Sequence, residues 1–265
     1  MKSSNNIPTW KTKHFWTDGW GSLGLALFVA LFIRWAFFEA YVIPSGSMLP
    51  SLLIHDHIFV NKFVYGVRIP FSEKWLVEFK KPERGEVVVF KFPLDMGTFF
   101  IKRVVAVEGD LVSYENGVLS LNGQPVAQRT PGDNSDFAWL RDEDFQRDGK
   151  TYDSKENYVH MLEELGAHPH SILLERSRMG GRSFGPIKVP PGHLFVMGDN
   201  RDNSNDSRYW ESPRLPPEKW YFLPREYILG RASVVWLSCE ETLPVVSFLC
   251  NPLTIRWTRF FHDVR

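Results

Sequence analysis

Three short segments, far apart in the sequence, hold the residues that could perform chemistry. The first spans residues 43–51 and reads IPSGSMLPS. Its two prolines and its glycine favour an irregular turn. Such a turn can direct the Ser47 hydroxyl and nearby backbone N–H groups toward one point, as acyl transfer requires. The alternative is an ordinary linker of the same composition.

The second segment, residues 99–107, reads FFIKRVVAV and is typical of a strand. Alternate residues of a strand share a face, which groups Lys102 with Phe100, Val104 and Ala106. Burial among apolar side chains lowers the pKa of a lysine, and a decrease of roughly two units would make it a general base near pH 8. Lys102 is therefore the candidate base for Ser47.

Arg103 should point to the opposite face of the same strand, so its replacement by lysine should be tolerated. The alternative for the whole segment is an edge strand, with both cations reaching water along their aliphatic stems.

The third segment, residues 198–210, reads GDNRDNSNDSRYW and follows a predicted strand. Short polar side chains in this density can build a fixed hydrogen-bond network beside an active site. Asp202, Ser204 and Asp206 alternate as in a calcium loop, but the sixth position lacks glycine and Pro213 occupies the twelfth. A solvated polar turn is the remaining alternative.

The histidine and cysteine residues give no pattern of a metal site. His55 and His57, like His168 and His170, are isolated pairs, which we interpret as surface histidines; neither a metal nor a cofactor is expected. Cys239 and Cys250 form no C-x-x-C pair. Outside the cytoplasm they could form a disulfide that closes residues 240–249 into a loop.

The elements that must position these residues are mostly short strands. They are expected at residues 58–64, 86–92, 99–107, 112–114, 118–121, 193–197 and 232–237, with Asn116-Gly117 as a tight hairpin. This rhythm predicts an all-β catalytic domain, antiparallel and closed or sandwich-like, made of residues 39–126 and 188–265. Residues 127–187 break the rhythm and predict a smaller inserted lobe, with a helix-like stretch near residues 157–165.

An uncharged apolar run over residues 19–33 predicts one N-terminal transmembrane helix over residues 20–38. Lysines at 2, 11 and 13 precede it, so residues 1–19 should be cytoplasmic and the rest should lie outside. The alternative is a cleaved secretory signal peptide. Bulky Phe38 disfavours cleavage after Ala40, and cleavage after Ser47 would destroy the first segment.

Composition limits the partners. Among the 265 residues, 31 basic side chains balance 31 acidic ones, which gives no reason to expect nucleic acid. Aromatic residues make up 15% of the chain, and the basic, aromatic end at residues 256–261 suits contact with membrane lipid.

The three segments, in this order after an apolar run, resemble bacterial type I signal peptidases, also called leader peptidases. The resemblance includes the IKRVV strand at residues 101–105 with Gly109-Asp110, the box from Gly198 to Arg208, and LGRA at residues 229–232. It spans roughly residues 20–125 and 185–237. Two features depart from many relatives: a single span, and the segment between the cysteines.

The resemblance implies an endopeptidase of the cytoplasmic (inner) membrane that removes N-terminal signal peptides from exported preproteins after small-X-small sites. Ser47 would be the nucleophile and Lys102 the general base, with Ser45 and the Ser47 N–H as oxyanion donors. Ser204 would hold the lysine amine by a hydrogen bond, with Asp206 and Arg208 as a supporting ion pair. The substrate-binding residues would be Tyr41, Ile43, Met48, Val89 and Ile101.

Two other functions are compatible with parts of the pattern. A related Ser–Lys autoprotease shares the chemistry, but it should carry a DNA-binding module and no span. A non-enzymatic membrane-tethered module would have no need for a lysine on an apolar face.

Overall fold

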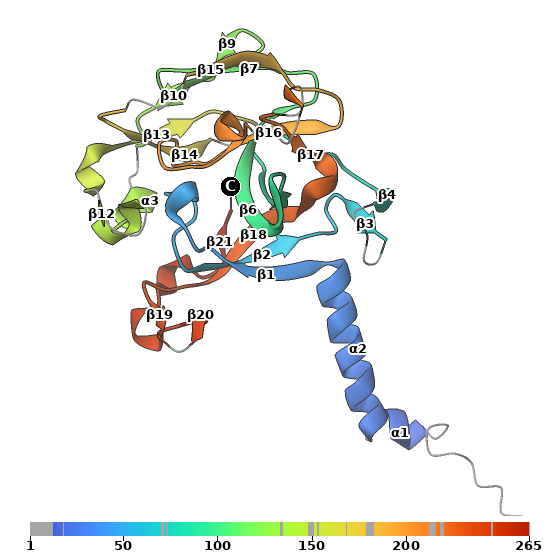
Figure 1. Cartoon of the computed structure of the whole chain (residues 1–265). Coiled ribbons are helices and arrows are strands. Elements are labelled where there is room, and N and C mark those ends of the chain that lie inside the picture. The colour runs from blue at the N-terminus through green and yellow to red at the C-terminus, as the bar shows by residue number, and fades with distance from the viewer. Residues whose placement is uncertain are drawn as a thin grey trace, which may run out of the picture.

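The computed structural model describes residues 13–17, 19–69, 72, 74–132, 135–147, 151–152, 154–167, 169–178, 183–211, 216–217, 220–244 and 246–264. It consists of a β-rich body from which an N-terminal helix projects (Figure 1).

The largest sheet carries most of the catalytic candidates. Within the described residues it has eight strands in the order β1-β2-β18-β5-β6-β16-β17, with β21 paired to β18, and neighbouring strands are antiparallel. The strands are β1 (Phe38–Val42), β2 (Asp56–Asn61), β5 (Val87–Phe92), β6 (Asp95–Val107), β16 (His193–Met197), β17 (Leu223–Pro224), β18 (Ile228–Ser238) and β21 (His262–Asp263).

Smaller antiparallel sheets surround it. One holds β7 (Leu111–Glu115), β8 (Val118–Leu121), β9 (Gln124–Pro125) and β15 (Phe184–Lys188). Another holds β10 (Gln128–Arg129), β13 (Tyr158–Glu163) and β14 (His170–Glu175). The two-stranded pairs are β3 (Gly66–Arg68) with β4 (Trp75–Glu78), β11 (Gln146–Arg147) with β12 (Thr151–Tyr152), and β19 (Thr242–Leu243) with β20 (Val246–Cys250).

Helices are few and short. The α-helices are α1 (Lys13–Thr17), α2 (Trp20–Ala36) and α3 (Ser135–Ala138). The 3₁₀ turns are η2 (Gly46–Met48), η3 (Asp142–Phe145), η4 (Lys155–Asn157), η5 (Ser207–Tyr209), η7 (Arg225–Tyr227), η8 (Pro252–Thr254) and η9 (Trp257–Arg259). The all-β, antiparallel prediction is therefore confirmed.

The predicted strands are found with shifts of a few residues, and β8 and β16 have the predicted bounds. The hairpin between β7 and β8 turns at Asn116 and Gly117, both with positive φ (50° and 85°), as an Asn-Gly turn requires. The prediction of a helix-like stretch near residues 157–165 is wrong. Strand β13 occupies it, because cross-strand pairing with the fully buried β14 outweighs the local pattern.

The inserted segment shares a core with the turn that carries Ser47. Leu49 and Leu53, just after that turn, pack in one buried cluster with Leu140, Phe145, Tyr158 and Leu173. Strand β14 also forms a parallel bridge, between Leu173 and Asn200. The domain division at residues 126/127 and 187/188 stays a prediction.

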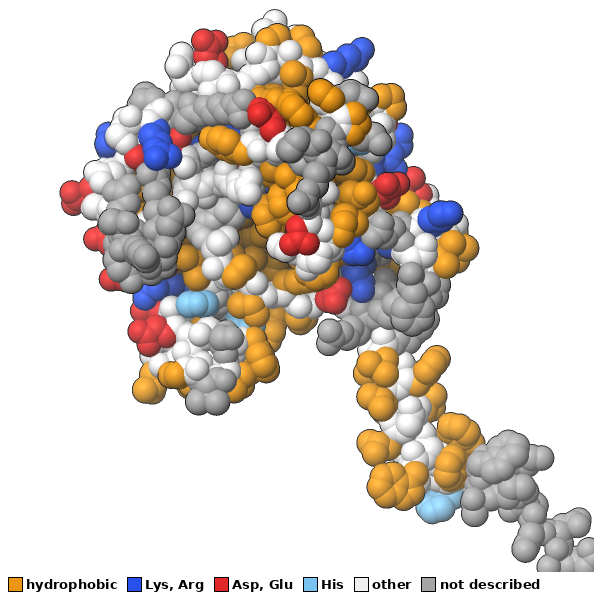
Figure 2. Space-filling view, in the orientation of Figure 1, with side chains coloured by type: hydrophobic (Ala, Val, Ile, Leu, Met, Phe, Trp, Pro, Cys, Tyr) orange, Lys and Arg blue, Asp and Glu red, His pale blue; other side chains and the backbone are white. Residues whose placement is uncertain are grey.

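Helix α2 coincides with most of the expected transmembrane segment. Its exposed apolar side chains include Leu23, Leu27, Phe28 and Leu31. Figure 2 shows hydrophobic side chains along this helix. In the described part of the chain, none of the helices has both the length and the apolar character needed to cross a bilayer. The expected end at Phe38 is wrong, because Phe38 begins β1 and pairs with Asn61 of β2.

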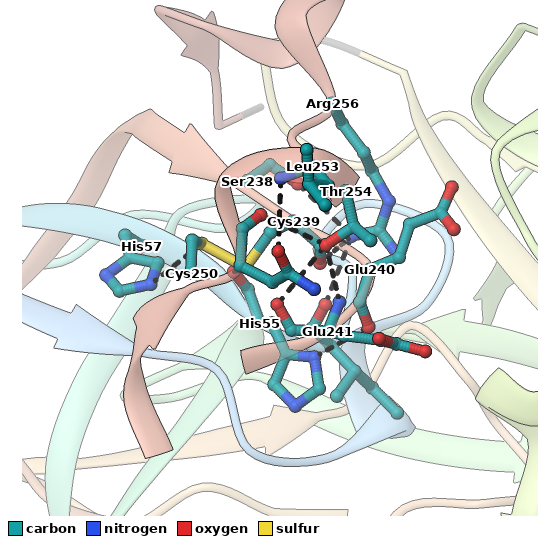
Figure 3. The surroundings of a disulfide bond; sticks show 12 residues. His55, His57, Ser238, Cys239, Glu240, Glu241, Cys250, Leu253, Thr254 and Arg256 are labelled. Atoms are coloured by element: carbon teal, nitrogen blue, oxygen red, sulfur yellow. Dashed lines mark hydrogen bonds between the residues drawn. A yellow bond between two sulfur atoms is a disulfide. The ribbon is translucent and has the colours of Figure 1, made fainter. Parts of the chain in front are cut away.

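A disulfide joins Cys239, at the end of β18, to Cys250, at the end of β20 (Figure 3). It closes the β19–β20 hairpin, which extends from the body in Figure 1. The Arg256 guanidinium donates to the Cys239 carbonyl at 2.8 Å and to Ser238 Oγ at 3.2 Å, which ties the chain after the hairpin back to β18. The expected pairing is confirmed.

Removing this disulfide should lower stability. Replacing both Cys239 and Cys250 with serine should lower the free energy of unfolding in urea by about 2–4 kcal/mol, because the unfolded chain regains the freedom of the closed loop. Reductant should destabilise the wild type to a similar extent and leave the double variant unaffected. Two free thiols in the native protein, detected by mass spectrometry, would contradict this pairing.

Candidate active site

Ser47 and Lys102 lie side by side, although 55 residues separate them. Lys102 Nζ is 2.8 Å from Ser47 Oγ and donates a second hydrogen bond to the Ile101 carbonyl at 2.8 Å. Ser47 stands in η2, and Lys102 stands in β6 opposite Val88 of β5. The irregular turn thus brings the Ser47 hydroxyl into hydrogen-bond contact with the Lys102 amine, which the sheet holds in position.

Lys102 is buried, with 4% of its surface exposed. Its ammonium lies 5.3 Å from the centre of the Phe100 ring, which shares its face of β6 as expected. Burial lowers the pKa of Lys102 from 10.5 to about 8, and the charges of Asp206 and Asp199 oppose this decrease. The edge-strand alternative is excluded, since neither Lys102 nor Arg103 reaches water.

The alternation of faces fails beyond Val104. A bulge in the pairing of β6 with β16 lies between Val104 and Ala106. Val104 packs with Phe100, whereas Ala106 packs in another cluster beside Val105. Ala106 therefore does not belong to the surroundings of Lys102 in the predicted way.

The surroundings of Arg103 argue against the expected tolerance of lysine at this position. Arg103 is 1% exposed, and its Nε and Nη2 donate to the two oxygens of Asp199 at 2.7 and 2.6 Å. Nη1 donates to the Gly85 carbonyl at 2.7 Å. On the opposite face of β6, Arg103 thus forms a buried, bidentate ion pair with Asp199. Lysine cannot reproduce its planar geometry.

The polar segment after β16 forms a fixed network and not a solvated turn. Arg208 donates to both oxygens of Asp206, at 2.9 and 2.8 Å, and Asp206 accepts the Gly198 N–H at 3.0 Å. Both side chains are fully buried, and the Arg208 guanidinium helps keep the pKa of Asp206 below its ordinary value against the opposing effect of burial. The predicted Asp206–Arg208 pair is present.

Ser204 lies against the nucleophile's turn, but it does not bond to the lysine. A Cβ at residue 198 would overlap both Ser204 Oγ and the Ser47 carbonyl, so the close approach requires glycine. The expected hydrogen bond between Lys102 and Ser204 is absent from this part of the structure, and the Ile101 carbonyl accepts from Nζ instead.

Asn200 also contacts the nucleophile's turn, and sequence reasoning did not single it out. Its backbone N–H donates to the Ser47 carbonyl at 3.2 Å, and its Nδ2 donates to the Gly46 carbonyl at 3.1 Å. Gly46 itself packs tightly against the inserted segment, since a Cβ there would lie 2.8 Å from the Asp144 carbonyl. Its position within the polar segment at residues 198–210 was the signal in the sequence that could have pointed to it.

Ser45 is exposed, and its Oγ lies 3.4 Å from Ser47 Oγ. Its backbone is extended (φ −143°, ψ 157°), which places it just outside the η2 turn. Its hydroxyl can therefore reach the same side of the turn as the nucleophile.

The five expected substrate-binding residues come together in one apolar cluster beside the dyad. Ile43, Met48 and Val89 are buried in it, whereas Tyr41 and Ile101 are partly exposed against it. The rings of Tyr41, in β1, and Phe99, in β6, are 6.1 Å apart, so these two strands approach each other above the cluster.

The interpretation of His57 and His170 as surface residues is wrong, since they are only 6% and 3% exposed. His57 Nε2 lies 3.5 Å from Cys250 Sγ, and the three side chains of His57 and the two cysteines meet within 4.8 Å (Figure 3). Both sulfurs are joined in the disulfide. His170 contacts Glu163 and Asp199, and His168 lies outside the described residues.

Arg103→Lys should be destabilising. The variant keeps a buried charge but loses the bidentate geometry, so the free energy of unfolding should fall by about 2 kcal/mol or more. Arg129→Lys is the matched control, because Arg129 pairs with Glu164 at the surface and should change stability by less than about 0.5 kcal/mol. Equal urea unfolding curves for the two variants would contradict this prediction.

Comparison with known proteins identifies the family of this chain. Residues 16–237 match the family model described as signal peptidase, peptidase S26. The chain is 43% identical over 226 residues to signal peptidase I of Pseudomonas fluorescens, covering 85% of this chain and 73% of the relative. It is 39% identical, with the same coverage, to signal peptidase I of Pseudomonas aeruginosa, and 33% identical to that of Aquifex aeolicus, where 88% of each chain is covered. The chain therefore belongs to the signal peptidase family, peptidase S26, and is an endopeptidase that removes signal peptides.

Proposed function

We propose that Ser47 attacks the scissile carbonyl of a preprotein while Lys102 acts as the general base. The observation that carries this proposal is the 2.8 Å contact between Lys102 Nζ and Ser47 Oγ at a lysine whose pKa is lowered to about 8. A substantial fraction of Lys102 is then neutral near pH 8, and a neutral amine can accept the Ser47 proton.

In the first step Ser47 Oγ bonds to the carbonyl carbon, its proton passes to Lys102 Nζ, and the carbonyl π electrons move to the oxygen. The Ser47 N–H and the Ser45 hydroxyl stabilise this oxyanion. The C–N bond then breaks, and the Lys102 ammonium gives its proton to the leaving amine. Water attacks the acyl-enzyme with Lys102 again as base, which releases the signal peptide and restores Ser47.

Two ion pairs support the dyad in this proposal. Arg103 of β6 pairs with Asp199 and joins the start of the polar loop to this strand, whereas Arg208 pairs with Asp206 within the loop. Ser204 packs beside Gly198 and acts as a wall of the site, since no hydrogen bond joins it to Lys102.

The substrate class follows from the apolar cluster. Ile43, Met48 and Val89 are buried in this cluster. In the proposed pocket these side chains would bound the residue before the cut and leave space for small side chains only. Tyr41 and Ile101 stand at its partly exposed rim. The substrates would therefore be exported preproteins that carry small residues at the first and third positions before the cut.

For the location of the enzyme we propose that the apolar α2 anchors the chain to the cytoplasmic membrane, with the β-rich body on the outer face. The exposed apolar side chains of α2 support this topology, as do the lysines that precede it in the sequence. Neither a Ser–Lys autoprotease of the repressor type nor a tethered binding module would need an apolar N-terminal helix and a buried, deprotonated lysine together.

The dyad is tested by substitution and by pH. Ser47→Ala and Lys102→Arg should each abolish preprotein cleavage, because alanine has no nucleophile and arginine cannot release its proton. In the wild type the cleavage rate should rise as pH increases through about 8 and then level off, since the neutral amine is the active form.

Lys102→Met supplies a control that does not depend on activity. Below pH 8 both folded and unfolded states carry the ammonium, so its burial destabilises the fold fully, and this penalty fades between pH 8 and 10.5. The variant should be inactive but more stable near pH 7, by up to about 3 kcal/mol in urea unfolding. Substantial cleavage by Lys102→Arg would refute the general-base role.

Specificity can be tested with a preprotein series that varies only the residue before the cut. Alanine, glycine and serine should be processed, and leucine or phenylalanine should be cleaved at least about 100-fold more slowly, because they would clash with Ile43 and Met48. Product masses identify the cut. Efficient cleavage after phenylalanine would contradict the proposed pocket and leave the dyad untouched.

A further inference from the structure

Asn200 is fully buried and holds two consecutive carbonyls of the nucleophile's turn. Its Nδ2 donates to Gly46 O at 3.1 Å, and its backbone N–H donates to Ser47 O at 3.2 Å. Gly46 O belongs to the same peptide unit as the Ser47 N–H. Because a peptide unit is planar and trans, a bond that fixes the direction of its carbonyl also fixes the N–H that points the opposite way.

We infer that Asn200 is a positioning residue for the oxyanion site: its side-chain amide holds the Gly46–Ser47 peptide so that the Ser47 N–H faces the developing oxyanion. This inference rests on the proposed Ser–Lys mechanism. Asn200 touches neither the substrate nor the reacting atoms, and it acts entirely through this peptide unit.

The peptide needs such a restraint. Gly46 lacks a Cβ, so its own torsions resist a rotation of this peptide less than those of other residues would. The only other hydrogen bond to Gly46 O recorded in the described structure comes from the Leu49 N–H and is longer, at 3.3 Å. An oxyanion donor must stand about 2.7–3.1 Å from the oxyanion, so a modest rotation of the peptide would remove it from range.

Asn200 is itself held on both sides. The Leu173 N–H donates to Asp199 O at 2.9 Å, and the Arg201 N–H donates to Leu173 O at 3.0 Å, which joins this part of the loop to β14. The flanking side chains are anchored as well, Asp199 by Arg103 and Arg201 by Glu163. The Asn200 amide therefore projects from a rigid base, as a positioning group requires.

The Nδ2 bond also strengthens the donor. A hydrogen bond to the carbonyl polarises the peptide and makes the N–H at its other end a better donor, an effect that is larger in a buried site than in water. Asn200 thus affects both the direction and the strength of the oxyanion donor.

The test compares Asn200→Ala with Asn205→Ala, a matched variant at an exposed position of the same loop. Cleavage of a signal-peptide substrate is measured with the active-site concentration determined separately, so that misfolded protein does not count. For Asn200→Ala, kcat per active site should fall by about 10- to 100-fold with KM nearly unchanged, because only the transition state is affected. Asn205→Ala should keep the wild-type kcat.

A peptide boronate provides a second readout. Its adduct with Ser47 is tetrahedral and places an oxygen at the oxyanion position, whereas the matching product peptide binds as a ground state. In Asn200→Ala the Ki of the boronate should rise by the same factor by which kcat/KM falls, and the Ki of the product peptide should not change. If the alanine variant fails to fold, Asn200→Leu keeps a similar volume, removes the donor without adding a charge, and should give the same pattern.

Two outcomes overturn the inference: a wild-type kcat per active site in both Asn200 variants, or a loss of rate with no change in boronate affinity. Ser47→Ala is measured in the same assay. If Ser47→Ala still cleaves, the proposed nucleophile is wrong and the inference about Asn200 fails with it. If Ser47→Ala is inactive while the Asn200 variants cleave normally, only the inference about Asn200 is wrong.

Discussion

The proposed mechanism depends on one constraint: a substantial fraction of an amine must be neutral although it lies among buried charges. Lys102 loses its hydration in the sheet, which lowers its pKa, but Asp206 and Asp199 attract its proton and act in the opposite direction. Each carboxylate is paired with a buried arginine, Arg208 or Arg103. The arginines reduce the negative potential at Nζ, so desolvation remains the larger effect. The ion pairs therefore affect the pKa of Lys102 and also hold the residues around it in position.

The same pairs explain why the inserted segment contacts the site. Buried ion pairs contribute little net stability and need other bonds to hold their geometry. Strand β14 supplies these bonds through Leu173, and Glu163 of β13 pairs with Arg201 on the loop. The nucleophile's turn packs on the same segment through Leu49 and the close approach of Gly46. The turn that carries Ser47 and the polar loop are thus both held against the inserted segment.

What could be predicted from the sequence is what neighbouring residues decide, and what could not be predicted depends on partners far away in the sequence. Strands β5, β6 and β16 were predictable because alternation and turn residues are local signals. The sequence could predict that Lys102 and Ser47 meet, because an ordered set of motifs limits the chemistry, and the two side chains are in contact. Arg103 was misjudged, since the sequence tells which face a side chain takes but not what covers that face. Its partner lies 96 residues away. The stretch now known as β13 was mistaken for a helix for a similar reason, because its partner β14 decides its conformation.

The pKa of about 8 is itself a compromise that the geometry explains. Deeper burial, or the loss of either carboxylate charge, would lower the pKa and raise the fraction of neutral amine. It would also make the amine a weaker acceptor for the serine proton, and the best base has a pKa close to the working pH. In the proposed mechanism, two carboxylates that oppose desolvation without overcoming it would keep Lys102 near this optimum. The buried acids would then keep the dehydrated lysine basic enough to accept the Ser47 proton.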